Sequence, residues 1–99
     1  MTEPTSESPL LFEVVEDHIA VVRFNRPQAR NAVDGETALA LNAAIDRIEA
    51  DPALRVAILT SSTPGMFCAG ADLKVVAAGR VAELRPNDAG FAGFVDAPR

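Results

Sequence analysis

The sequence contains few of the residues that build disulfides, metal centres and membrane spans. Its one cysteine, Cys68, has no partner for a disulfide within the chain and supplies no metal-binding spacing, so we expect no metal site. The apolar runs extend for only a few residues, far short of a membrane span, and the polar, acidic start of the chain lacks the features of a signal peptide. We therefore expect a cytoplasmic protein without a membrane partner.

Positive charge is also scarce. Nine basic and fourteen acidic residues give a net charge of −5 at pH 7. A nucleic-acid partner would require a basic face, so none is expected. The 99 residues are 48% hydrophobic and 23% charged, which is typical of a globular protein. At this length the chain forms one domain with one modest core.

The first half of the chain predicts a hairpin followed by a helix. Residues 1–9 have the composition of a disordered tail. Residues 10–17 and 19–25 read as two strands joined by a tight turn at Asp17-His18. Residues 36–50 carry apolar side chains at helical spacing and predict an amphipathic helix, with Asp34 as its N-cap. The dipeptide Asp51-Pro52 ends it, because the residue before a proline is steered away from the helical region.

The second half predicts a strand and a short helix. Residues 55–60 (RVAILT) form a continuous apolar run, which favours a strand covered on both faces. The order strand, helix, strand implies a parallel pair. Residues 72–78 predict a short helix capped by Asp72 and ended near Gly79, and residues 88–95 a helical turn or two. This is an incomplete α/β fold of β-β-α-β type whose one long helix leaves one face of the sheet bare. Either a partner chain covers that face or the chain is the first part of a larger domain, and we favour the larger domain.

The segment that carries chemistry is residues 66–74 (MFCAGADLK), directly after the apolar strand. Its small residues allow a close approach to the main chain, and Gly70 can adopt a conformation closed to other residues. An N–H at Ala71, before a helix that starts at Asp72, would be well placed to donate to a carbonyl oxygen that becomes negative during a reaction. Tight packing and simple helix capping explain the same residues, so both interpretations stay open here.

Two motifs together resemble those of the crotonase family, the enoyl-CoA hydratases and isomerases. The first is FNRPQARNA at the end of the second strand, and the second is FCAGADLK after the apolar strand. The resemblance covers roughly residues 10–78 and identifies residues 10–99 as the N-terminal part of a crotonase-like domain whose second half is absent. It implies a fold of repeated β-β-α units, an acyl-CoA substrate and assembly as a homo-oligomer, a trimer or hexamer. It implies no cofactor besides the coenzyme A of the substrate.

The resemblance also implies which residues meet the substrate. The backbone N–H of Ala71 aligns with the first oxyanion donor of the family. The positions that align with contacts to the CoA portion of the substrate are Gln28, Ala29, Arg30, Ala69, Gly70, Ala71, Asp72, Leu73 and Lys74.

The family's other catalytic groups have no match in these residues. The second oxyanion donor lies in a GGG segment, and two glutamates lie in and after it, but no GGG occurs here. We therefore expect enoyl-CoA hydratase chemistry for the family domain and an inactive 99-residue chain. The alternatives are another reaction of the family (isomerase, dehydratase or thioesterase) and a non-catalytic CoA-binding or interaction fragment.

Several single residues have two interpretations. Asp72 is a helix cap or a catalytic acid, and the cap is favoured. Cys68 lacks a nearby histidine in the sequence to activate it as a nucleophile. Lys74 fits a CoA phosphate or a solvated helix face. The guanidinium groups of Arg23, Arg26 and Arg30 suit phosphates, yet arginines are common near strand ends.

Overall fold

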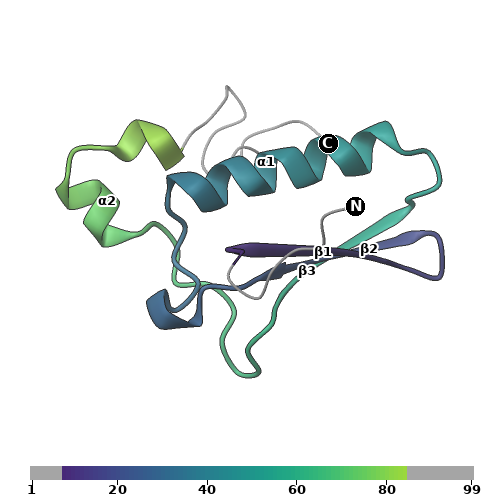
Figure 1. Ribbon diagram of the computed structural model, residues 1–99, viewed down its shortest axis with the longest axis horizontal. Coiled ribbons are helices and arrows are strands. Elements are labelled where there is room, and N and C mark those ends of the chain that lie inside the picture. The colour runs from purple at the N-terminus through teal and green to yellow at the C-terminus, as the bar shows by residue number, and fades with distance from the viewer. Residues whose placement is uncertain (1–7, 85–99) are drawn as a thin grey trace.

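The predicted order of strands and helices is confirmed over the residues that the computed structural model describes, 8–84 (Figure 1). The predicted helical turns at residues 88–95 and most of the predicted tail at residues 1–9 lie outside the described residues. In chain order the elements are β1 (Leu10–Val15), β2 (Ile19–Phe24), the 3-10 helix η1 (Pro27–Ala29), α1 (Gly35–Ala50), β3 (Val56–Ser61), α2 (Leu73–Ala77) and the 3-10 helix η2 (Val81–Leu84).

The hairpin forms where the alternating residues place it. β1 and β2 pair antiparallel, with Phe12 opposite Val22. The turn begins one residue earlier than predicted, because Glu16 and Asp17 have positive φ angles of 52° and 64° and the His18 N–H donates to the carbonyl of Val15 at 3.3 Å. Two successive positive φ angles are typical of the turns that match the twist of a hairpin.

α1 starts and ends at the predicted signals. The Asp34 carboxylate accepts hydrogen bonds from the Thr37 N–H at 2.9 Å and from the Thr37 hydroxyl at 2.7 Å, so two polar groups at the start of the helix are satisfied. Asp51, before Pro52, leaves the helical region. The helix buries Leu41 against the sheet, at 1% exposure.

β3 pairs parallel with β2, as expected, and gives the strand order β1-β2-β3. The prediction that β3 is covered on both faces is wrong: Val56, Ile58 and Leu59 are 54%, 46% and 37% exposed. β3 lies at the edge of the sheet, and the buried core includes β2 side chains such as Val22 and Phe24 but none from β3. The described residues therefore leave most of the apolar side chains of β3 exposed.

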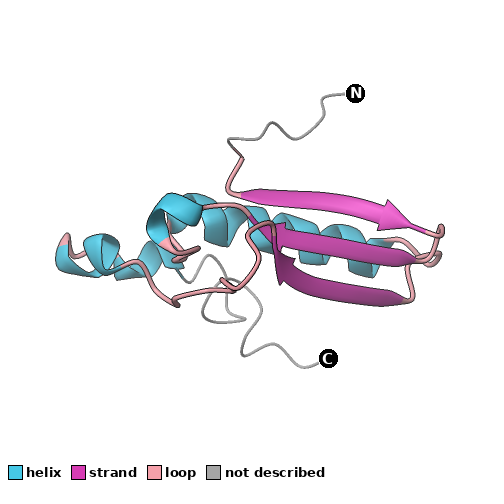
Figure 2. Ribbon diagram, turned by 90° about the horizontal axis from the view of Figure 1, so that it is seen from below, coloured by secondary structure: helices cyan, strands magenta, loops and turns pink. Residues whose placement is uncertain are grey.

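No described helix covers the second face of the sheet (Figure 2), as predicted, although Val21 on that face is only 7% exposed. Figure 2 shows the three strands lying in front of α1, with no described helix over their other face. Cross-strand partners share a face, so Val21 and its partner Ile58 lie on the same side of the sheet, opposite Val22 and Leu59. No helix within residues 8–84 is long and apolar enough to cross a membrane.

We expect Leu41→Ala to destabilise the chain by about 3 kcal/mol, because it leaves a cavity in the buried core of the described residues. Urea unfolding followed by circular dichroism measures this loss. Leu39→Ala is the matched control, since Leu39 lies on the same helix but is 60% exposed, and should change stability by less than about 0.5 kcal/mol. Equal losses for both variants would contradict this assignment of the core.

Candidate functional site

The two segments that carry the sequence motifs meet beyond one end of the sheet. Because β2 and β3 are parallel, the loops that follow them leave the sheet at the same end. The loops then form a short parallel bridge between Val33 and Ala71. In this bridge the Val33 N–H donates to the Gly70 carbonyl at 2.7 Å, and the Asp72 N–H donates to the Val33 carbonyl at 2.9 Å.

Asn31 joins the same two loops through its side chain. It is 1% exposed, and its Nδ2 donates to the Phe67 carbonyl at 2.7 Å and to the Ser61 hydroxyl at 2.9 Å. Its Oδ1 accepts from the Arg26 N–H at 2.7 Å. The sequence alone assigned no role to Asn31. The signal that could have marked it is its residue type, because asparagine is one of the residues that tolerate a positive φ angle. The φ angle of Asn31 is 57°.

A cleft of about 430 Å³ lies between these loops. All the residues predicted to contact substrate line it except Gly70. The lining consists of Arg26, Gln28, Ala29, Arg30, Ala32, Ala69, Ala71, Asp72, Leu73 and Lys74. The structure therefore brings the two motifs together in one concave site, from residues 37 to 48 positions apart in the sequence.

The Ala71 N–H is one of three backbone donors of the cleft lining, with those of Gln28 and Leu73, that have no acceptor among the described residues. Its neighbours donate within the chain: the Ala69 N–H to the Arg30 carbonyl at 3.1 Å, the Gly70 N–H to the Cys68 sulfur at 3.4 Å, and the Asp72 N–H to Val33. Among residues 8–84 the Ala71 N–H has no acceptor. It is an unpaired donor in a residue that lines the cleft.

Peptide geometry fixes the direction of this donor. The Gly70 carbonyl and the Ala71 N–H belong to one trans peptide unit, so they point in opposite directions. Since the Gly70 carbonyl accepts from Val33, the Ala71 N–H points away from the Val33 segment. Gly70 reaches this geometry with a φ angle of 92°, which side chains rarely permit.

Asp72 caps α2, which confirms the favoured interpretation. Its Oδ1 accepts from the Lys74 N–H at 2.9 Å, and its Oδ2 lies 3.3 Å from Nη1 of Arg26. The Lys74 N–H, with a further contribution from the Arg26 guanidinium, lowers the pKa of the Asp72 carboxyl. A carboxylate held ionised in this way is an anionic anchor and a poor proton donor near neutral pH.

The cations near the cleft fall into two groups. Arg26 lies between Asp34 and Asp72, and Arg23 pairs with Glu13 at 2.5 Å, so the charges of both are matched by carboxylates within the chain. Arg30 and Lys74 are exposed and form no ion pair with another described residue. Of the predicted phosphate partners, these two remain available for a ligand.

Cys68 has a packing role in the site. Its sulfur donates to the Asn31 carbonyl at 3.3 Å and accepts from the Gly70 N–H at 3.4 Å. His18 lies at the hairpin turn, where Nδ1 is 2.9 Å from the Ala53 carbonyl at the opposite end of the sheet. No histidine therefore lies beside Cys68 to activate it as a nucleophile. Within residues 8–84 no His, Cys, Asp and Glu side chains gather into a metal-binding group.

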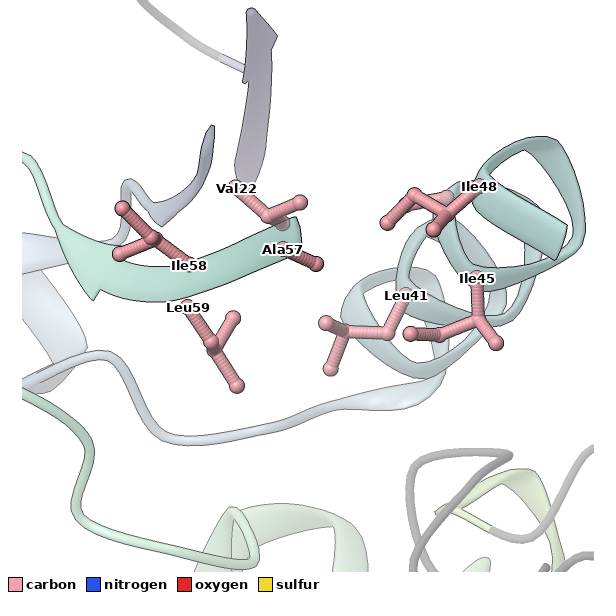
Figure 3. Close-up of a pocket in the computed structure, with 8 residues that line it drawn as sticks. Val22, Leu41, Ile45, Ile48, Ala57, Ile58 and Leu59 are labelled. Carbon is pink, nitrogen blue, oxygen red and sulfur yellow. The ribbon is translucent and has the colours of Figure 1, made fainter. Parts of the chain in front are cut away.

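A second hollow, between α1 and β3, is purely apolar. It has a volume of about 90 Å³, and Leu41, Ile45 and Ile48 of α1 face Ala57 and Leu59 across it (Figure 3). It offers no polar group to orient a substrate. This hollow is therefore a weaker candidate for the functional site than the cleft between the two loops.

Acid should destabilise the chain partly through Asp72. Because its pKa is lowered on folding, its contribution to stability is present above the ordinary pKa of an aspartate and is lost as the pH falls from about 4 through the lowered value. Asp72→Asn keeps an oxygen for the cap, so its unfolding free energy should fall less between pH 5 and pH 2.5. Urea titrations at several pH values measure this, with Asp46→Asn, an exposed α1 position, as control. Equal acid sensitivity of wild type and Asp72→Asn would contradict the prediction.

Comparisons with known proteins show which family the chain resembles. The chain is 41% identical to the (E)-benzylidenesuccinyl-CoA hydratase of Thauera aromatica over 66 residues, which is 67% of this chain and 25% of that protein. It is 40% identical to the carnitinyl-CoA dehydratase of Proteus mirabilis over 73 residues, 74% of this chain and 28% of that protein. The chain thus spans about a quarter of the length of the curated relatives that it matches.

Solved structures show the same fold. The crystal structure of enoyl-CoA hydratase EchA1 from Mycobacterium marinum superposes with a TM-score of 0.78 at 40% identity, over 93% of this chain and 34% of that one. The family model for enoyl-CoA hydratase/isomerase matches residues 15–91 and includes both loops of the cleft. The chain belongs to the enoyl-CoA hydratase/isomerase family, the crotonase family.

Proposed function

We propose that the cleft binds the thioester of an acyl-CoA and that the Ala71 N–H donates to its carbonyl oxygen. The observation that carries this proposal is the unpaired Ala71 N–H, beside neighbours that donate within the chain, in a residue that lines the cleft. An unsatisfied donor of fixed direction stabilises an oxygen that gains negative charge.

Such a donor suits the addition of water to an α,β-unsaturated thioester. When water adds to the β-carbon, the electron pair of the double bond moves toward the carbonyl and leaves an enolate whose charge lies on the thioester oxygen. The names of the relatives, a hydratase and a dehydratase of CoA thioesters, support this class of reaction. Removing one oxyanion donor typically costs about 3 kcal/mol of barrier.

Arg30 and Lys74 suit the phosphates of the CoA portion. Both line the cleft, both are exposed, and neither is paired with a carboxylate among the described residues. Leu73, 78% exposed on the same wall, offers an apolar contact for the uncharged part of the ligand. We propose that phosphate oxygens meet these two cations while the thioester lies at Ala71.

Proton transfer in the reaction needs groups beyond those that line the cleft. Asp72 is the one carboxylate in the lining, and Lys74 and Arg26 already engage it. We propose that the 99-residue chain binds acyl-CoA without turning it over, and that hydration requires the glutamates and second donor of the family domain. Assembly into a trimer or hexamer and a cytoplasmic location are part of the same proposal.

Binding at Ala71 is tested by NMR of the ¹⁵N-labelled chain. We expect crotonyl-CoA to move the Ala71 amide proton downfield, because a carbonyl oxygen becomes its acceptor. S-butyl-CoA, a thioether with a four-carbon chain that lacks the thioester carbonyl, should bind without that shift. The Val33 amide, already bonded to Gly70, is the internal control. An Ala71 resonance that responds equally to both ligands, or to neither, would contradict the proposed role.

Charge reversal tests the proposed phosphate contacts. We expect Arg30→Glu and Lys74→Glu each to weaken CoA binding about fivefold, with a smaller effect at high salt. Isothermal titration calorimetry with CoA measures both changes. Arg55→Glu changes the net charge by the same amount at the opposite end of the sheet and is the matched control. An equal loss in Arg55→Glu would show that only overall charge matters.

A further inference from the structure

We infer that Arg26 is a positioning residue that holds the Ala71 N–H in place by joining the two segments of the bridge. The inference rests on the proposed function for the role of that N–H. Arg26 is not assigned a contact with the ligand: it acts through Asp34 and Asp72.

The Arg26 guanidinium reaches three acceptors on the two segments. Its Nη1 donates to the Ala32 carbonyl and lies 3.3 Å from Oδ2 of Asp72, and its Nη2 lies 3.5 Å from Oδ2 of Asp34. The side chains of Arg26, Asp34 and Asp72 are only 17%, 27% and 12% exposed. Charge pairs that are partly withdrawn from water interact more strongly than exposed ones.

The two carboxylates flank the bridge that orients Ala71. Asp34 directly follows Val33, and Asp72 directly follows Ala71, while Val33 and Ala71 are the bridge partners. Arg26 therefore links the two segments one residue beyond the bridge, through an ion pair to each segment. Without it, two carboxylates would face the same space and repel each other, and the segments would separate at the peptide that carries the donor.

The planar fork of arginine is what this position requires. A guanidinium presents several N–H groups in fixed directions and serves acceptors on two segments at once, whereas the ammonium of a lysine is a single point charge. Asn31 holds the backbone of Arg26 in turn, since its Oδ1 accepts from the Arg26 N–H at 2.7 Å. The charge of Arg26 is thus committed within the chain, although its side chain lines the cleft.

The first test needs no ligand. In ¹⁵N spectra of the free chain, Arg26→Met should shift or broaden the amide resonances of Ala71 and Asp72, because the two segments lose the ion pairs that link them beside the bridge. Arg26→Lys should change the same amide resonances in the same direction. Because it keeps the positive charge, it serves as the second variant if Arg26→Met fails to fold. Leu41→Ala is the matched control for stability, since its destabilisation arises in the core. Ala71 resonances that ignore both Arg26 substitutions, or that move equally in Leu41→Ala, would overturn the positioning role.

The second test asks whether the carbonyl is recognised. Calorimetry gives the ratio of affinities for crotonyl-CoA and S-butyl-CoA, and we expect this ratio to fall about fivefold in the Arg26 variants, the contribution of one hydrogen bond. A merely structural role would weaken both ligands alike and leave the ratio unchanged, which would overturn the inference. If the wild-type chain itself shows no preference for crotonyl-CoA, the proposed function fails, while the ligand-free spectra still decide the role of Arg26.

Discussion

The parallel pairing of β2 with β3 decides where the two loops that form the cleft lie. Parallel strands require a crossover, which α1 supplies, and they send their following loops out at the same end of the sheet. Each of those loops carries one of the two motifs. The Val33–Ala71 bridge continues the parallel alignment beyond the sheet, and the cleft forms around that bridge. An antiparallel arrangement would have placed the loops at opposite ends.

The largest cluster of buried residues lies on one side of the sheet. The core lies between α1 and the face of the sheet that includes Val22 and Phe24, whereas the apolar side chains of β3 are largely exposed. β3 is uncharged along its length and lies at the edge of the sheet. Edge strands of this kind are normally covered or charged in isolated domains. In the solved relatives, about two thirds of the chain lies outside the part that matches these residues.

Polar side-chain contacts between the two loops fix the geometry of the cleft. Small residues at positions 69–71 make room for a ligand, but their side chains do not fix the conformation of the loop. The holding groups are Asn31, nearly fully buried, and Arg26, between two carboxylates. Both belong to the first motif and act on the second. A pre-organised donor depends on such supporting contacts, because a backbone amide that moves freely loses most of its value to an oxyanion.

Local chemistry was enough to predict the hairpin, α1 with its Asp34 cap and the short helix after Asp72, because caps, turns and periodicity act over a few residues. The set of residues that gather at the cleft was predicted from the resemblance of the two motifs to the crotonase family. The tertiary structure decided the rest. It left β3 exposed, committed the charge of Arg26 to Asp34 and Asp72, and left the Ala71 N–H without an acceptor among the described residues. These outcomes depend on contacts between residues 36 and 46 positions apart, such as Asn31 with Phe67 and Arg26 with Asp72, which no local pattern specifies.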